Sequence, residues 1–515
     1  MKLGTLARTT GITLVVLLGV AGFVSGATHR FFDYDEIYHA HATWLIAHGD
    51  RPFHDFQGSH LPFLWYPLAV AWRVLPDSPT TLLPLRFVAG LGTLLWVVGI
   101  AACLTAVRRE IPLRWVIVGF AAVAFYQSVI DYALEFRPDS WSNALLFFAL
   151  FLVLTQRPAS VAKRYAIFGF LATLAVLASP KLFLLPAIFA VIDCDDHLRR
   201  RDHPGAVVVG YTIGVGAALL VGIAFLAIAR VNPILAFDMS IEYQLAFESH
   251  NSFGLGLMES VLRQPLLVYL ILGGGFAWAD YLLRVGRRAS PYEIAVFMFL
   301  FVEIETVDRP YKQYYAPWFL VAATFVPFAG LFVEQTFKRV APWCFAAAIA
   351  LSGWSAWNTL RLFSQENQAA DMLAFYDTLV RLSPADAAIV AYPPFHPVVR
   401  RDVFYAWSRT TDPGGYTTEP IMRALEIPGY SERFEPAYYP QQLDTTPPVV
   451  VVSPVKGDSG YEPLQWATLR EYLAAERFKY ALVDEGLLRP VWLRRGDIRR
   501  HALEQQPPAV QPLYE

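Results

Sequence analysis

The sequence predicts an α-helical polytopic membrane protein that carries a C-terminal extracytoplasmic α/β domain. Of its 515 residues, 55% are hydrophobic and the mean hydropathy is +0.37, which is more apolar than a water-soluble chain of this length. Apolar stretches recur along the first two thirds of the chain, and several approach the ~20 residues that a membrane-spanning helix needs. From about Gln365 onward, prolines and charged residues become frequent, which indicates a different environment.

We expect about eleven transmembrane helices, one for each apolar segment. The first segment follows Lys2 and Arg8 and ends at Ser25-Gly26-Ala27, so a cleaved signal peptide is the alternative to an uncleaved first helix. Both alternatives give the same orientation. The segments cover roughly residues 10–26, 82–107, 112–130, 140–155, 165–178, 181–192, 205–229, 264–283, 292–306, 314–334 and 340–360.

Charged residues in the connecting loops predict the orientation. With a cytoplasmic N-terminus, every short inner loop is rich in Lys and Arg, while the longer outer loops are poor in them, as the positive-inside rule requires. We therefore expect a multi-pass protein of the plasma (inner) membrane, with the C-terminal domain outside. The inner-loop cations are Lys2, Arg8, Arg108, Arg109, Arg114, Arg157, Lys163, Arg164, Arg199, Arg200, Arg201, Arg284, Arg287, Arg288, Lys338 and Arg339.

Two stretches of the chain are too short for simple crossings. Leu61–Leu75 is apolar, but a crossing here would turn all later basic loops outward, so we expect a helix that lies in the outer membrane interface. Segments 165–178 and 181–192, taken as one crossing, would place Arg199–Arg201 outside. We therefore expect two short helices that are broken at Ser179-Pro180.

The predicted domains are a transmembrane module at 1–362 and an extracytoplasmic α/β domain at 363–515. The first outer loop, at 27–81, is expected to carry catalytic residues of the module. In the second domain, short β-type runs alternate with helical patterns, which is typical of an α/β fold. The β-type runs are 387–392, 448–453 and 479–485, and the helical patterns are 371–382 and 469–477.

Carboxylates and imidazoles gather in the first outer loop. Asp35 and Glu36 can act as a general base on a hydroxyl or an amine, although acids at a helix start give the same pattern. A metal site is an alternative, because Glu36 and His39 would share one face of a helix. The spacing matches no strong metal motif. The histidines of this loop are His39, His41, His48, His54 and His60.

Later outer loops bring cations to the same side. Arg137 and Asp139 lie at the mouth of a helix, where a role in a site and a local salt bridge are equally supported. Lys181 lies at a helix break, and because broken membrane helices usually line cavities, it is expected to bind an anion. The loop at 307–313 suits a phosphate, or else neutralises nearby acids. The residues are Arg309 and Lys312 of this loop and Tyr314 directly after it, and the acids are Glu303, Glu305 and Asp308.

Acids and cations that converge outside the membrane suit an enzyme with a lipid-phosphate substrate. Nucleic-acid binding and P-loop chemistry are not expected, because the chain has no basic tail, zinc-finger spacing or Gly-rich phosphate loop. The alternative is a polytopic transporter or lipid flippase. Such a protein would place ionisable groups near the bilayer midplane and repeat its broken helices in two halves, and this sequence has no evident repeat.

Several stretches resemble the GT-C superfamily of polyprenyl-phosphate-sugar glycosyltransferases, in the protein-mannosyltransferase-like and aminoarabinose-transferase-like branch of family 39 type. The resemblance covers about residues 1–335. YDEIYHAHATWLIAHGDRPFHDF is similar to the family's first outer loop, and EFRPDSW to its second-loop Arg-Pro-Asp. HLPFLWYPLAVAWRVL and LLPLRFVAGL are similar to its Pro-aromatic segment and the start of its second membrane helix. SPKLFLLP and RPYKQYYAPW are similar to its short-helix Lys segment and its late basic-aromatic motif.

The resemblance implies a GT-C helical bundle and an inverting, nucleotide-independent reaction. The donor would be a polyprenyl-phosphate sugar, and the envelope acceptor would be a protein, a lipid or a glycan. Asp35 would be the catalytic base, with Glu36 as the second choice, and Asp139 would assist the acceptor or a metal. No cofactor is certain, and a divalent metal ion stays open without assigned ligands.

The resemblance also implies a phosphate site. Lys181, Arg309 and Lys312 would hold the lipid phosphate and stabilise its charge as it leaves. Many relatives have Lys-Pro-Pro-Leu where this chain has His60-Leu-Pro-Phe, so a protonated His60 would replace that lysine. Arg137 and Tyr314 complete the expected set of substrate-binding residues.

Overall fold

The computed structural model of the chain describes most of the bundle and the central part of the C-terminal sheet. The described residues are 2–56, 60–157, 160–242, 265–306, 312–391, 394–403, 438–452, 469, 471–475, 480–483, 489, 491–494 and 510–512. The chain forms two units. Unit 1 is Met1–Arg30, Arg86–Ile223 and Ser249–Glu366, and unit 2 is Phe31–Leu85, Ala224–Glu248 and Asn367–Glu515.

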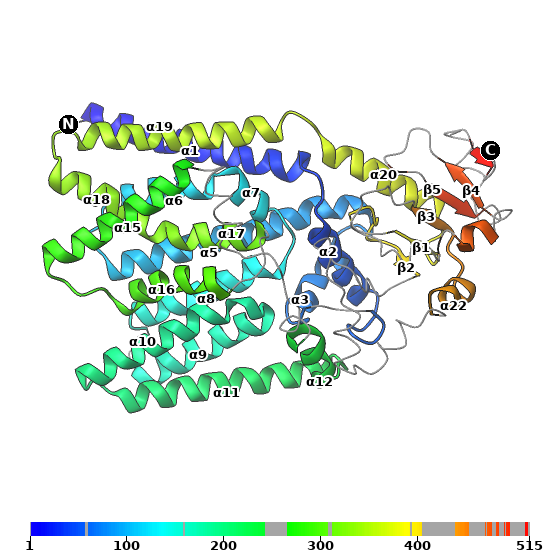
Figure 1. The fold of residues 1–515 in the computed structure, drawn as a ribbon, viewed down its shortest axis with the longest axis horizontal. Helices are drawn as coiled ribbons and strands as arrows, with labels where there is room; N and C mark the ends of the chain where they lie inside the picture. Colours follow the sequence, from blue (N-terminus) through cyan, green and yellow to red (C-terminus); the bar gives the residue numbers. More distant parts are fainter. Residues whose placement is uncertain are drawn as a thin grey trace. The chain divides into compact units, whose positions relative to one another are not determined.

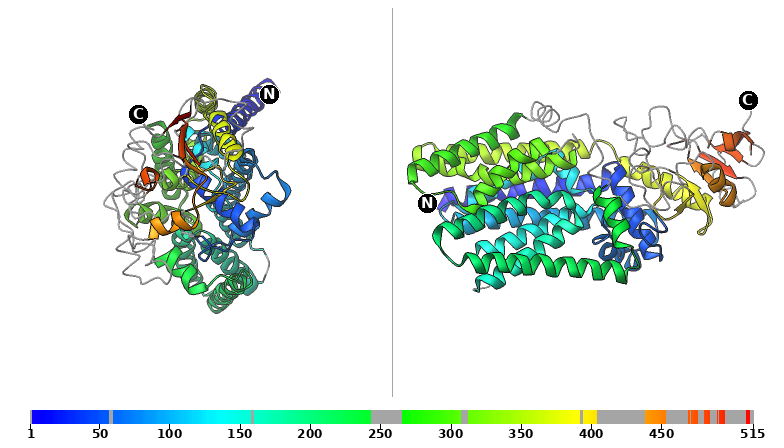
Figure 2. Two further views of the ribbon diagram at one scale, coloured as in Figure 1. Left: turned by 90° about the vertical axis from the view of Figure 1, so that its right-hand side faces the viewer. Right: turned by 60° about the horizontal axis from the view of Figure 1, so that its bottom comes forward.

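Unit 1 is a bundle of apolar helices that run side by side along one direction (Figures 1 and 2). A helix is found at each of the eleven predicted apolar segments, because helices satisfy every backbone polar group within an apolar stretch. The elements are α1 (Lys2–His29), α5 (Leu82–Val107), α6 (Leu113–Ala124), α7 (Gln127–Ala133), α8 (Pro138–Leu154), α9 (Val161–Ala178), η2 (Pro180–Phe183), α10 (Leu184–Arg200), α11 (Pro204–Ile228), α15 (Pro265–Val285), α16 (Pro291–Thr306), α17 (Lys312–Ala322), η4 (Ala323–Phe325), α18 (Val326–Thr336) and α19 (Ala341–Phe363).

Several of these helices are long and apolar enough to cross a membrane. Among the described residues, five helical stretches pass this test alone, and α6 with α7, bent by 78° at their junction, would make a sixth. Large apolar side chains lie exposed on them, such as Leu220 at 69% and Leu94 at 58%, as expected for lipid-facing positions. The predicted polytopic membrane protein is confirmed. The five stretches are Thr9–His29, Pro79–Val107, Val161–Ala178, Pro204–Ile228 and Tyr315–Thr336.

Small residues allow close contact between helices of unit 1. A Cβ atom at Gly214 of α11 would clash with the carbonyl oxygen of Ala166 on α9, so only glycine permits this crossing. The predicted break at Ser179-Pro180 is also confirmed. Helix α9 ends at Ala178, the short 3-10 turn η2 follows, and α10 begins at Leu184.

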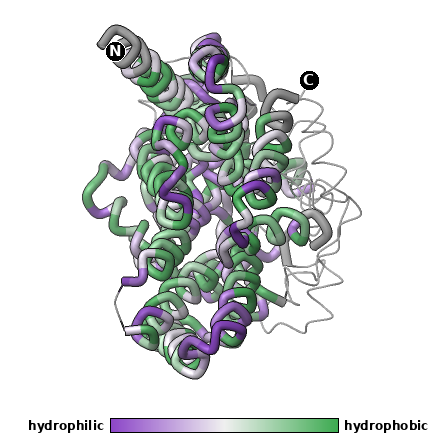
Figure 3. The backbone as a smooth tube through the Cα atoms, turned by 90° about the vertical axis from the view of Figure 1, so that its left-hand side faces the viewer, coloured by the Kyte–Doolittle hydropathy of each residue, from purple (hydrophilic) through white to green (hydrophobic). Residues whose placement is uncertain are grey.

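Polar turns gather at the end of unit 1 where the chain begins (Figure 3). Three ion pairs join the turns there, linking Arg108 to Glu293, Arg287 to Glu110 and Arg114 to Glu334. The turns between α5 and α6, between α15 and α16, and between α18 and α19 therefore lie together. These are three of the predicted basic inner loops.

Unit 2 contains a six-stranded mixed sheet and short helices. The strand order is β2-β1-β3-β5-β4-β6, in which β2, β1 and β3 pair in parallel and the remaining pairs are antiparallel. The strands are β1 (Ala388–Val390), β2 (Arg401–Asp402), β3 (Val450–Val452), β4 (Tyr480–Val483), β5 (Val491–Arg494) and β6 (Val510–Pro512). The helices are α2 (Tyr34–Ala47), α3 (Trp65–Ala69), α4 (Ala71–Val74), η1 (Pro79–Thr81), α12 (Pro233–Phe237), α20 (Gln368–Leu382) and α22 (Tyr438–Thr445), and Asp238–Glu242 form the π-turn η3.

The first outer loop packs with C-terminal residues inside unit 2. The ring of Phe32 lies 6.1 Å from that of Tyr376, and the imidazoles of His41 and His396 stack at 4.0 Å. Burial lowers the pKa of His396 to about 3 and also lowers the pKa of His41, so both rings are neutral at pH 7. Aromatic contacts between residues far apart in the chain therefore define unit 2.

Candidate functional site

A cluster of buried charges lies at the start of α8, at the opposite end of unit 1 from the basic turns. Oδ1 of Asp139 accepts a hydrogen bond from Ser179 Oγ at 2.6 Å. Its Oδ2 accepts from Lys181 Nζ at 2.7 Å and from Arg137 Nε at 3.1 Å. Arg137 also reaches Glu135 at 3.3 Å. Asp139 is 1% exposed, so its charge depends on these donors for compensation.

Local sequence explains why these groups meet. Arg137 caps α8, Pro138 occupies the first helical position, and Asp139 stands in the first turn, where backbone N–H groups favour an acid. Helix α9 ends before η2, and this break directs the side chains of Ser179 and Lys181 toward the first turn of α8. In a continuous helix, the two side chains would follow the helical spacing instead. Lys181, at the helix break, thus lines a pocket, as the sequence predicts for a broken membrane helix.

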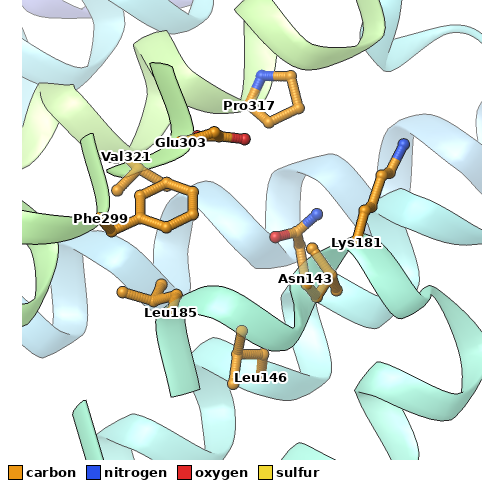
Figure 4. Close-up of a pocket in the computed structure, with 9 residues that line it drawn as sticks. Asn143, Leu146, Lys181, Leu185, Phe299, Glu303, Pro317 and Val321 are labelled. Carbon is orange, nitrogen blue, oxygen red and sulfur yellow. The ribbon is translucent and has the colours of Figure 1, made fainter. Parts of the chain in front are cut away.

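A pocket lies beside this cluster, within unit 1 (Figure 4). Its empty space, together with the part that is open to solvent, is about 420 Å³. The carboxylate of Glu303 and the amide of Asn143 point into it, and Lys181 rises along one side. Aliphatic and aromatic side chains form the rest of the wall. They are Leu146, Leu182, Leu185, Phe299, Pro317 and Val321.

The two predicted catalytic carboxylates of the first outer loop have different environments. Asp33 and Glu36 form a capping box at the start of α2, in which Glu36 Oε2 accepts a hydrogen bond from the Asp33 backbone N–H at 3.3 Å. Glu36 is fully buried, whereas Asp35 is half-buried. Glu36 therefore stabilises the start of α2, and Asp35 is the more accessible carboxylate.

His60 lies in an aromatic cluster of unit 2. Its ring centroid is 4.9 Å from that of His39 and 6.3 Å from those of Tyr38 and Trp65. His39 Nδ1 accepts a hydrogen bond from Trp65 Nε1 at 2.9 Å. Two of the loop's histidines are thus packed side by side, and His60 keeps partial exposure.

The side chains of three predicted substrate-binding residues lie outside the described part of the chain. Arg309 lies outside the described residues. Lys312 and Tyr314 belong to the backbone of α17, but their side chains are likewise outside the described part. The structure thus brings Arg137, Asp139 and Lys181 together in unit 1, and it places Asp35, Glu36 and His60 in unit 2.

The sequence analysis did not single out Ser179, Asn143 or Glu303 as site residues. A signal was present for each of them. Ser179 directly precedes the helix-breaking proline, and Asn143 lies one turn after Asp139, where its side-chain amide donates to the Asp139 carbonyl at 2.9 Å. Glu303 was treated only as a counter-charge for the next loop, although an acid inside an apolar segment is itself a signal of function.

The fold has counterparts among solved structures. ArnT from Cupriavidus metallidurans in the apo state aligns with a TM-score of 0.58 at 15% identity, over 95% of this chain and 98% of that chain. The same protein bound to undecaprenyl phosphate aligns at 0.48 with 17% identity, over 78% and 91%. AglB from Archaeoglobus fulgidus, in complex with an inhibitory peptide and a dolichol-phosphate, aligns at 0.46 with 13% identity, over 95% and 74%.

No protein-family model and no curated protein matches the sequence. The alignment with apo ArnT nevertheless extends over almost all of both chains. The predicted fold class is confirmed: the chain has a GT-C type helical bundle followed by a region with a sheet.

Proposed function

We propose that this protein is a membrane glycosyltransferase that moves a sugar from a polyprenyl-phosphate donor to an envelope acceptor at the outer face of the membrane. The observation that carries the proposal is the buried cluster of Arg137, Asp139 and Lys181 beside a mostly apolar pocket, in a fold shared with ArnT. ArnT has also been solved with undecaprenyl phosphate bound.

The leaving group explains the need for fixed cations. When the bond between the sugar C1 and the phosphate oxygen breaks, its electron pair stays on the phosphate, whose negative charge increases. Lys181 and Arg137 stabilise that charge most effectively if they are already held in place. Asp139 fixes both, and its two carboxylate oxygens are occupied by donors. Arg309, Lys312 and Tyr314 are proposed to complete the phosphate site, and His60 of unit 2 is proposed as a further substrate-binding residue.

Asp35 is the proposed general base. It takes the proton from the acceptor hydroxyl or amine as the acceptor oxygen or nitrogen forms its bond to the sugar C1. Its partial exposure supports this role, whereas Glu36 is buried in the helix cap. A divalent metal would find hard oxygen ligands at Asp33 and Asp35, two residues apart at the start of α2.

The proposed topology follows from the grouped basic turns of unit 1. That end faces the cytoplasm, in accordance with the positive-inside rule. The start of α8 and η2 then lie at the outer face, as does the proposed extracytoplasmic α/β domain at 363–515. This arrangement suits a donor in the outer leaflet and an acceptor in the envelope.

Substitution of the proposed base tests the function. Purified protein in membranes is incubated with polyprenyl-phosphate sugars and envelope acceptor, and release of polyprenyl phosphate is measured. We expect Asp35→Asn to lower the rate by about 10²–10⁴-fold, with unchanged insertion and thermal stability. Asp55→Asn, in the same loop, is the control and retains the wild-type rate. Full transfer by Asp35→Asn would remove Asp35 from this role, and no release by the wild type with any donor would contradict the function.

A lipid flippase is the second candidate, because Glu303 is an ionisable residue buried inside the helical bundle. A flippase would move polyprenyl-phosphate sugars across vesicle membranes without releasing polyprenyl phosphate. The same incubation therefore separates the two functions.

A further inference from the structure

The carboxylate of Glu303 is the unusual feature of the pocket in unit 1. The residue is 8% exposed, and its Oε2 atom has no hydrogen-bond partner among the described residues. A buried acceptor without a partner costs free energy, and the cost is larger when the group is charged. A ligand with a hydrogen-bond donor would satisfy this acceptor.

The wall around Glu303 restricts the chemistry of that ligand. Asn143 uses its amide N–H₂ on the Asp139 carbonyl, which leaves its side-chain oxygen as a second acceptor on the pocket. A hydrocarbon chain offers no donor and would leave both acceptors unsatisfied. A hydroxyl or an ammonium group satisfies them, and the apolar wall covers the C–H surface of the same ligand.

The pocket lies next to the proposed phosphate site, because the two share Lys181. Lys181 lines the pocket and places its ammonium group on Asp139 at one side. Asn143 lies one helical turn, about 6 Å, deeper along α8 than Asp139. A sugar that is covalently attached to a phosphate at Lys181 is then close to Asn143, and Glu303 lines the same pocket.

We propose that this pocket receives the sugar of the donor, and that Glu303 accepts a hydrogen bond from a hydroxyl or ammonium group of that sugar. Glu303 is then a specificity-determining residue, on the helix that faces Asn143. The inference rests on the proposed function, since it takes the donor to be a polyprenyl-phosphate sugar.

Binding measurements separate this inference from the proposed function. Purified protein in detergent micelles is titrated with polyprenyl phosphate alone, with a polyprenyl-phosphate neutral hexose and with a polyprenyl-phosphate amino sugar, and complexes are counted by native mass spectrometry. We expect Glu303→Leu to bind the bare lipid phosphate like the wild type and to bind a sugar-bearing donor at least about tenfold more weakly. Glu303→Gln keeps an acceptor but removes the charge. It therefore loses affinity for the amino sugar if the partner is an ammonium, and keeps its affinity for the neutral sugar if the partner is a hydroxyl.

The controls assign each result to one claim. Glu334→Gln changes a carboxylate of the same unit that already pairs with Arg114, and it retains binding of all three lipids. Equal binding of both sugar donors by Glu303→Leu and by the wild type would overturn the inference while the proposed function stands. Failure of the wild type to bind the bare lipid phosphate would contradict the proposed function. If Glu303→Leu does not fold, Asn143→Leu on the facing helix is tested in its place, with the same expected loss.

Discussion

Two buried glutamates on the helix α16, one near each end of the bundle, differ in their hydrogen-bond partners. Glu293, in the first turn of α16, accepts from Arg108 Nη2 at 2.6 Å, from Arg108 Nε at 2.8 Å and from Trp278 Nε1 at 3.2 Å. The backbone and hydroxyl of Ser290 add bonds at 2.8 and 2.9 Å. Glu303 lies ten residues later, about 15 Å along the axis, and its Oε2 has no partner among the described residues.

The difference separates a structural carboxylate from a functional one. Every oxygen of Glu293 is occupied, so it joins α16 to the turn after α5 and has no capacity for a ligand. Glu303 is buried almost as deeply, yet it lines a pocket, and its Oε2 accepts no hydrogen bond from the described residues. Ion pairs thus link the helices at the basic end, whereas a pocket lies at the Glu303 end of α16.

The largest expected effect is on stability at the basic end. Glu293→Gln removes the charge that pairs with the buried guanidinium of Arg108, and we expect unfolding free energy to fall by about 3–5 kcal/mol. Unfolding of the purified protein in mixed micelles, followed by tryptophan fluorescence, measures this loss.

Glu303→Gln is the matched control, because it makes the same chemical change on the same helix. It breaks no hydrogen bond of the described residues, so its unfolding free energy is expected to stay within about 1 kcal/mol of the wild type. Equal destabilisation by the two substitutions would contradict the division of α16 into a structural and a functional half.

A smaller effect is expected at Lys181, which joins the buried cluster to the pocket. Lys181→Met removes the cation but keeps the length of the side chain, and we expect the KM for the lipid donor to rise about tenfold, equivalent to 1.4 kcal/mol. Initial rates over a series of donor concentrations measure the change. Lys181→Arg keeps the charge and serves as the control. An unchanged donor dependence in Lys181→Met would show that Lys181 only holds Asp139 in place.

The sequence was informative where local chemistry decides the structure. Apolar length predicted the helical segments, and Ser179-Pro180 predicted the break, because proline cannot continue a helix without losing a hydrogen bond. Of the alternatives given for Arg137, the local salt bridge is present, since its guanidinium pairs with Asp139. Its place in the site stays a prediction.

The remaining features depend on tertiary contacts that the sequence does not show. Glu293 and Glu303 look alike as acids in one apolar stretch, and only the approach of Arg108, 185 residues away, distinguishes them. The first outer loop belongs to unit 2, where the imidazole of His41 stacks on that of His396. Neither partner could be chosen from composition or periodicity.

The central claim is that the sugar of a polyprenyl-phosphate donor binds at the Glu303 end of α16, and photolabelling tests it most directly. A polyprenyl-phosphate sugar that carries a diazirine on its ring is irradiated with the wild-type protein, and the labelled peptides are identified by mass spectrometry. We predict labels on the pocket wall, at Leu146, Leu185, Phe299 or Val321, which unlabelled donor competes away. Labels around Glu293, or pocket labels that excess donor does not reduce, would contradict the account.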